Sequence, residues 1–446
     1  MDFGRDLRRM VGRELKAPAL WADAASLELL PLGALRREAA AAGLAVHQAG
    51  KPERSTRLLS YAVMLRELAR RTGEAEALGK AASAAEQAGR GAEGGVLVAA
   101  RLEQAASARL TAELFADGPA LTATETWLTA AEQVRPTPEI SVRRLAQRAA
   151  FDAANALQAC DLDEGVLAAT HLDEAVHQFD QWVRDNDKGR AEAAALRCER
   201  ADFLIGFGAR LKDKSMLIQA ENDLAQLSKR LDPAYLPLSW ARSEGLRGEA
   251  LAGLGDLTGD ANCLAEAVRV LAAAAEHIDF DHSPLDRARL SHTLALALEA
   301  LSEACGDEGL LDHALAAFDQ ALVVLEPSQA RALRAHAAYD RAACVARRAE
   351  REGDSEALVH AESAFRAELS RRDGPVDPAT WAVAQLALAR VYDARAALEG
   401  EASRPKEAAV ALTEALDVFT ELGLKTLAEA AQAALERARG EVSEAG

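Results

Sequence analysis

A repeat of 47 residues constrains the fold of this chain more than any other feature of its sequence. Four columns of residues recur at this spacing in one register over four consecutive units. The columns are Gly259, Gly306, Gly353 and Gly400; Ala241, Ala288, Ala335 and Ala382; Ala267, Ala314, Ala361 and Ala408; and Leu271, Phe318, Phe365 and Leu412. Internal repeats of this length indicate supersecondary units that stack to bury a continuous core.

The pattern extends toward the N-terminus with small slips, so the chain contains about eight units. Their centres are Leu78, Thr124, Ala175, Ala220, Ala267, Ala314, Ala361 and Ala408. Each unit has the pattern of two helices, a long first helix such as 285–304 and a second such as 310–326. Proline, glycine and aspartate lie between the units, where helices end.

The composition supports helices rather than sheets. Half of the residues are hydrophobic but only 4% are aromatic, and the apolar share comes mainly from Ala and Leu, which favour close-packed helices. We predict an all-α fold, a right-handed α-solenoid of about eight helical hairpins with capping helices at both ends. The expected parts are an N-terminal helical cap or docking segment (1–51), the repeat array (52–423), and a C-terminal capping helix with a short tail (424–446).

The second helices resemble those of the tetratricopeptide repeat family. That family places Ala, a large residue, Ala and Pro at fixed offsets. Thr124, Leu128, Ala131 and Pro136 keep these offsets with Thr in the first place, and the unit of Ala314, Phe318 and Ala321 reaches its proline, Pro327, one residue late. The unit is longer than the family's usual 34 or so residues, and the signature of the first helix is degenerate. The resemblance implies a groove lined by the first helices that binds protein segments.

Net charge and hydropathy limit the partners. The formal charge of −18 disfavours nucleic acid, whose phosphates need a clustered basic surface, and no apolar run reaches the ~18 residues of a membrane span. We expect a cytoplasmic protein, and the excess of Arg over Lys suggests a bacterial source. The five cysteines, Cys160, Cys198, Cys263, Cys305 and Cys344, are expected to be small buried residues without disulfides.

The first residues form a candidate amphipathic helix. Its apolar face would carry Phe3, Leu7, Met10, Val11 and Leu15, with arginines mostly on the other side. Such a helix can fold back to cap the first repeat, which we favour, or dock on a membrane surface or a partner.

No motif in the sequence indicates catalysis, so we predict no catalytic, cofactor-binding or metal-binding residues. The glycine-rich stretch 253–259 follows no strand and lacks the lysine of a phosphate-binding loop. The stretch 276–286 holds two histidines and three aspartates, but its spacing fits no calcium loop. A polar connection is the preferred interpretation there, and a metal site is the alternative.

One set of basic residues suggests a binding site. Arg197, Arg242, Arg289 and His336 recur at spacings of 45, 47 and 47 in the first helices. In a groove they would bind an acidic or carboxylate-bearing segment of another protein, although solvated residues paired with neighbouring acids are the favoured interpretation. The sequence therefore predicts a non-enzymatic scaffold or adaptor. The alternative functions are a regulatory module that docks through its N-terminal helix and, less favoured, an unrecognised enzyme.

Overall fold

The computed structural model describes residues 24–115, 117–135, 137–159, 161–186, 189–325, 329–370, 378–399, 404–421 and 425–444, and every regular element in these ranges is a helix. In chain order the helices are α2 (Ala24–Glu28), α3 (Leu32–Gln48), α4 (Lys51–Thr72), α5 (Ala75–Gly89), α6 (Gly94–Phe115), α7 (Gly118–Glu132), α8 (Pro138–Ala159), α9 (Leu162–Asn186), α10 (Arg190–Leu211), α11 (Lys214–Ser228), α12 (Pro237–Thr258), α13 (Ala261–His277), α14 (Pro284–Cys305), α15 (Gly309–Val324), α16 (Arg331–Glu352), α17 (Ser355–Leu369), α18 (Pro378–Glu399), α19 (Arg404–Glu421) and α20 (Lys425–Glu444).

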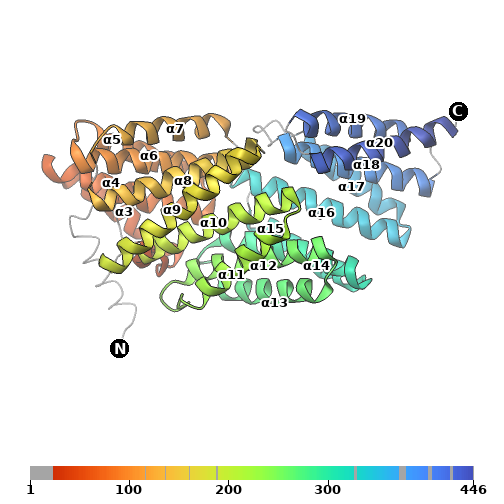
Figure 1. Ribbon diagram of the computed structural model, residues 1–446, viewed down its shortest axis with the longest axis horizontal. Helices are drawn as coiled ribbons and strands as arrows, with labels where there is room; N and C mark the ends of the chain where they lie inside the picture. Colours follow the sequence, from red (N-terminus) through yellow and green to blue (C-terminus); the bar gives the residue numbers. More distant parts are fainter. Residues whose placement is uncertain are drawn as a thin grey trace.

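The helices pair in order into eight hairpins, from α4–α5 to α18–α19, and each packs against its neighbours (Figure 1). The first helix of every hairpin has 22 residues. Helix α3 packs on the first hairpin and α20 on the last. The all-α solenoid of about eight hairpins, capped at both ends, is thus confirmed.

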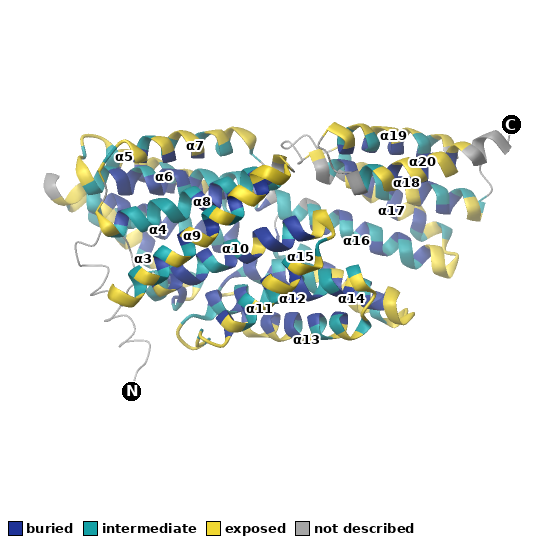
Figure 2. Cartoon of the chain, in the orientation of Figure 1, coloured by how far each residue is buried: buried dark blue, intermediate teal, exposed yellow. Residues whose placement is uncertain are grey.

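The columns seen in the sequence occupy the packed faces of the helices. Ala267, Ala314 and Ala408 are fully buried and Ala361 nearly so, and the large residues four positions later, such as Phe318, are buried in all four units. Figure 2 shows this alternation of buried inner and exposed outer faces along the hairpins. Alanine at these positions lets neighbouring helices approach closely, because a larger side chain would overfill a densely packed interior.

Glycine ends the first helices α12, α14 and α16, whereas α10 ends at Lys212 in the same left-handed conformation. Gly306, at the C-cap of α14, has a φ of +70° and donates its backbone N–H to the carbonyl of Ser302. Residues with a side chain rarely adopt this left-handed conformation, so glycine is the usual helix terminator. Gly259 and Gly353 have the same conformation after α12 and α16.

Several sequence predictions have a different outcome or lie outside the described residues. Cys198 and Cys344 are buried as expected, but Cys263 is half-buried and Cys305 is exposed, because Cys305 is the last residue of α14. Pro136 and Pro327, which were matched to the tetratricopeptide pattern, and Gly400 of the glycine column lie outside the described residues. So do Cys160 and the N-terminal amphipathic helix.

The N-terminal hairpins also contact the middle of the array. Helix α4 packs against α14 and α6 against α16, and Leu285 and Ala288 of α14 share one apolar cluster with Leu65 and Leu68 of α4. The N–H of Ala330, just before α16, donates to the carbonyl of Gly73 over 3.2 Å. These contacts turn the solenoid back on itself, so that its first hairpins lie beside its sixth and seventh.

The segment before α4 also binds to the middle of the array. The carboxylate of Glu28 accepts a hydrogen bond from the N–H of Ser239 in α12, and the N–H of Leu32 donates to the carbonyl of Asp281. His282 contacts the carbonyl of Glu28. The polar stretch 276–286 is therefore a docking surface for the N-terminal segment, which the sequence alone did not indicate.

Of the helices described, not one has an apolar stretch sufficient to cross a lipid bilayer.

Candidate functional site

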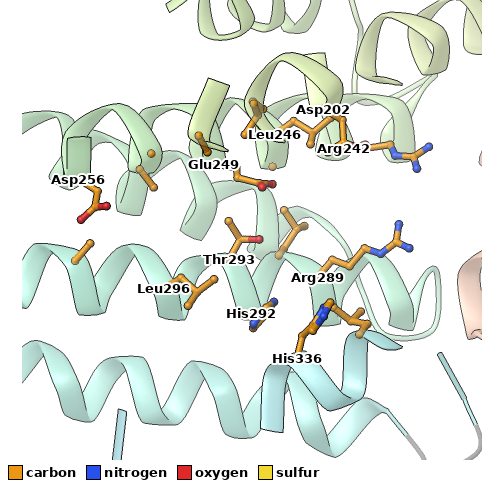
Figure 3. Close-up of a pocket in the computed structure, with 18 of the residues that line it drawn as sticks. Asp202, Arg242, Leu246, Glu249, Asp256, Arg289, His292, Thr293, Leu296 and His336 are labelled. Carbon is orange, nitrogen blue, oxygen red and sulfur yellow. The ribbon is translucent and has the colours of Figure 1, made fainter. Parts of the chain in front are cut away.

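A cavity of about 740 Å³ lies among the first helices of the middle hairpins, where the solenoid turns back on itself. Its walls come mainly from α10, α12, α14 and α16, with smaller contributions from α6 and α11 (Figure 3). Leucines and small residues form the apolar part, including Leu246, Leu290, Leu296 and Gly245. A side chain at Gly245 would clash with Leu290, since a Cβ there would lie 2.7 Å from its Cδ2. Glycine therefore permits α12 and α14 to meet closely at this wall.

Helical periodicity aligns the polar residues of the walls. Helix α12 contributes Arg242, Glu249 and Asp256, which are seven residues apart and so lie on one face after every second turn. Helix α14 contributes Arg289, Leu296 and Glu303 in the same way. Each helix thus presents a basic residue near its start and an acidic residue farther along.

The structure brings together three of the four predicted basic residues. Arg242, Arg289 and His336 are each the sixth residue of their helix and all line the cavity. Figure 3 shows Arg242 and Arg289 extending to the same side.

Arg197 lies elsewhere. It is the eighth residue of α10, and two extra positions rotate a side chain by about 200° around a helix. It pairs with Asp180 of α9 and lines a separate hollow between α9, α10 and α11. The spacing of 45 rather than 47 therefore removed Arg197 from the column that the other three share.

Internal carboxylates neutralise most of the basic groups around the cavity. Arg289 pairs with Glu113 of α6. Arg109 binds Glu199 through two hydrogen bonds of 3.0 and 3.1 Å. Arg242 donates no hydrogen bond within the described part of the chain. Its guanidinium instead experiences the charges of Glu199 and Glu113 at longer range, and these raise its pKa against the opposing effect of burial. Among the described residues of the cavity, Arg242 is thus the arginine whose donors all remain available to a ligand.

Carboxyl groups outnumber cations on the walls. The three arginines are Arg242, Arg289 and Arg347, and the eight acids are Glu113, Glu199, Asp202, Glu249, Asp256, Asp286, Glu299 and Glu303. This distribution carries a net negative charge, which a uniformly acidic ligand would not favour.

Glu249 and Asp202, like Asp256, form no ion pair within the described residues, and burial raises the pKa of the first two. Glu249 and Asp202 are the thirteenth residues of α12 and α10. Desolvation, followed by the charge of Asp202, raises the pKa of Glu249 to about 7, although Arg289 opposes the shift. Desolvation and Glu199 raise the pKa of Asp202 to about 6 against the opposing charge of Arg242. Both groups are therefore held where ionisation is unfavourable without a cation nearby.

Sequence reasoning missed these two acids. A signal existed, because Asp202 and Glu249 are 47 residues apart and share a register. Among 70 acidic residues, however, most of which cover solvated helix faces, the pair did not stand out.

No group of three metal-ligating side chains occurs among the described residues. The one cysteine of the cavity, Cys198, has its pKa raised to about 12 by burial, so its thiol stays protonated and is a poor nucleophile.

Comparisons with known proteins give distant likenesses of structure. No protein-family model and no curated protein matches the sequence. Among solved structures the chain is similar to a Rap protein complexed with competence and sporulation factor, with 12% identity, a TM-score of 0.48, and coverage of 85% of this chain and 97% of that one. It is also similar to a circular tandem repeat protein with 17% identity, a TM-score of 0.28, and coverage of 93% and 96%. Neither likeness bears on function.

Proposed function

We propose that this chain is a non-enzymatic scaffold or adaptor that binds a segment of a partner protein on the inner surface of its solenoid. The observation that carries the proposal is the cavity of about 740 Å³ between α10, α12, α14 and α16. Its volume lies in the range of pockets that bind small ligands, and its lining combines apolar walls with three arginines and eight acids.

Arg242 is the anchor for a carboxylate of that segment. Its guanidinium has no hydrogen-bond acceptor within the described residues, and a guanidinium binds a carboxylate through two parallel hydrogen bonds. Arg289 and His336 lie beside it on neighbouring helices. Because acids outnumber cations in the cavity, a segment with one carboxylate at this end, such as a chain terminus, fits better than a uniformly acidic one.

A peptide selection tests this function. The purified chain is incubated with an equimolar library of random hexapeptides that have free C-termini, and the retained peptides are identified by mass spectrometry. We expect a recurrent set of retained peptides. Their affinity should fall more than tenfold when the C-terminus is amidated, since the amide removes the charge that Arg242 binds.

Arg242→Gln is the informative variant, and Arg390→Gln is its matched control. Arg390 is an exposed residue of α18, outside the cavity. In calorimetric titration we expect Arg242→Gln to reduce the affinity for the selected peptide more than tenfold. Arg390→Gln should leave this affinity unchanged. If no peptide is retained, or if both variants bind like the wild type, the proposal is wrong.

A further inference from the structure

Glu249 and Arg242 lie on the same face of α12 at a defined separation. Seven residues of helix separate them, which corresponds to a rise of about 10 Å. An extended peptide spans that distance with three residues at about 3.3–3.6 Å each. The cavity therefore presents a cation and an acid at the two ends of a short peptide's length.

Neighbouring arginines are engaged with other acids and leave Glu249 without a close partner. Arg289, whose positive charge acts on Glu249, pairs with Glu113. Arg347 of α16 lies 3.1 Å from Glu303. Arg109 pairs with Glu199 on the side of Asp202. Glu249, surrounded by protein and directed into the cavity (Figure 3), thus retains its capacity to accept hydrogen bonds.

We propose that Glu249, with Asp202 beside it, receives a cationic group of the bound peptide, an Arg or Lys side chain about three residues before the carboxylate that Arg242 holds. This inference rests on the proposed function and specifies the ligand as a dipolar peptide bound in one direction. A guanidinium or ammonium would supply the positive charge that both carboxyl groups lack, and a partly dehydrated cavity strengthens such a pair relative to water.

The raised pKa values agree with this assignment. Glu249 and Asp202, with pKa values of about 7 and 6 in the empty cavity, would each ionise more readily beside a cation. Peptide binding should therefore release protons near neutral pH.

The experiment uses the best hexapeptide from the selection described above and a derivative in which its Arg or Lys is replaced by citrulline or norleucine. Affinities are measured by calorimetry for the wild-type chain, Glu249→Gln and Asp256→Asn. Asp256 is the matched control because it lines the same wall of α12 seven residues farther on. Far-ultraviolet circular dichroism and thermal melting establish that each variant is folded.

We expect the neutral derivative to bind the wild type more than tenfold more weakly than the parent peptide. The same comparison should show less than a twofold difference in Glu249→Gln and the full difference in Asp256→Asn. Retained peptides without any preference for a cation would overturn this inference and leave the proposed function intact. A cation preference lost in Asp256→Asn and kept in Glu249→Gln would also overturn it. Absence of any retained peptide would overturn both.

Discussion

The middle and C-terminal hairpins share their packing but present their first helices differently. Ala314 and Phe318 of α15 are buried in the middle region, and Ala361 and Phe365 of α17 are equally buried near the C-terminus. The sixth and thirteenth residues of α12, however, line a cavity, whereas those of α18, Val383 and Arg390, are exposed.

The difference shows that the repeat alone does not make the cavity. The N-terminal hairpins return onto α14 and α16 and contribute Glu113 to the lining of the cavity. The C-terminal first helix α18 has the same length and the same place in its hairpin but no such covering at these two residues. Stacking thus builds the solenoid, and long-range contacts add a wall to the cavity on its inner surface.

Among the variants that test this difference between the two regions, Arg71→Met should have the largest effect on stability. The Arg71 side chain is fully buried, donates hydrogen bonds to the carbonyls of Leu27 and Leu30, and pairs with Glu67. Its loss leaves the buried carbonyl of Leu30 without a donor and removes one donor from the Leu27 carbonyl and one from Glu67, which keeps its pair with Arg70. We expect a cost of about 3–5 kcal/mol, measured by denaturant unfolding. Arg90→Met, which removes an exposed pair with Glu86, is the control and should leave the unfolding midpoint unchanged. Equal midpoints for the two variants would contradict the role of Arg71.

Gly73→Ala should weaken more selectively the contact between the N-terminal hairpins and the start of α16. Gly73 has a φ of +73°, and a Cβ there would lie 2.8 Å from the backbone nitrogen of Ala330. Gly306→Ala is the matched control, because Gly306 has a φ of +70° but open space around it. Both variants bear the left-handed strain, so Gly73→Ala should be less stable than Gly306→Ala by about 1–3 kcal/mol of overpacking. Similar unfolding free energies would show that the contact with Ala330 is loose.

Overpacking the shared alanine positions should affect both regions alike. Ala314→Leu and Ala361→Leu each insert three carbons where the alanine is at most 2% exposed, and each should cost roughly 1–3 kcal/mol. Denaturant midpoints of the two variants measure the costs. A variant with an unchanged midpoint would show that its alanine is not at a close helix contact.

The most local expected effect is a pH dependence specific to the cavity. Because the folded pKa of Glu249 is raised from 4.5 to about 7, its ionisation opposes folding, and the wild type should lose stability as pH rises through this window. Glu249→Gln lacks this loss. Its unfolding midpoint should match the wild type at pH 4 and exceed it increasingly up to pH 8. The charges of Asp202 and Arg289 also act on the Glu249 carboxyl in the wild type. The measurement is therefore the difference in unfolding midpoint between Glu249→Gln and the wild type at each pH, rather than the pH curve of either protein. If the difference between the two unfolding midpoints did not change with pH, the raised pKa of Glu249 would be contradicted.

The repeat made the fold predictable, whereas the closure of the solenoid had no periodic signal. Small residues such as Ala267 and Ala314 recur because each unit packs against the next, and this local regularity is visible in one sequence. The contacts of Glu28 with Ser239 and of Arg70 with Asp286 join residues more than 200 positions apart, and each occurs once. The polar stretch 276–286 therefore looked like an ordinary connection.

The site was predictable only in part, for a geometric reason. The basic column identified Arg242, Arg289 and His336 because they share a register, but a slip of two residues placed Arg197 on another face of its helix. Glu249 and Asp202 gained significance only from their enclosure and from the engagement of the nearby arginines, neither of which a linear sequence displays.

Photocrosslinking of the selected peptide most directly tests the central claim that the partner segment lies in the cavity. A photoreactive benzoylphenylalanine replaces Leu296 of α14 in one variant and Val383 of α18 in another. The two residues are similarly accessible, at 38% and 41%, but only Leu296 lines the cavity. We predict that irradiation with the bound hexapeptide gives a crosslinked product from position 296 and none from position 383. A product from position 383 with none from position 296 would contradict the account.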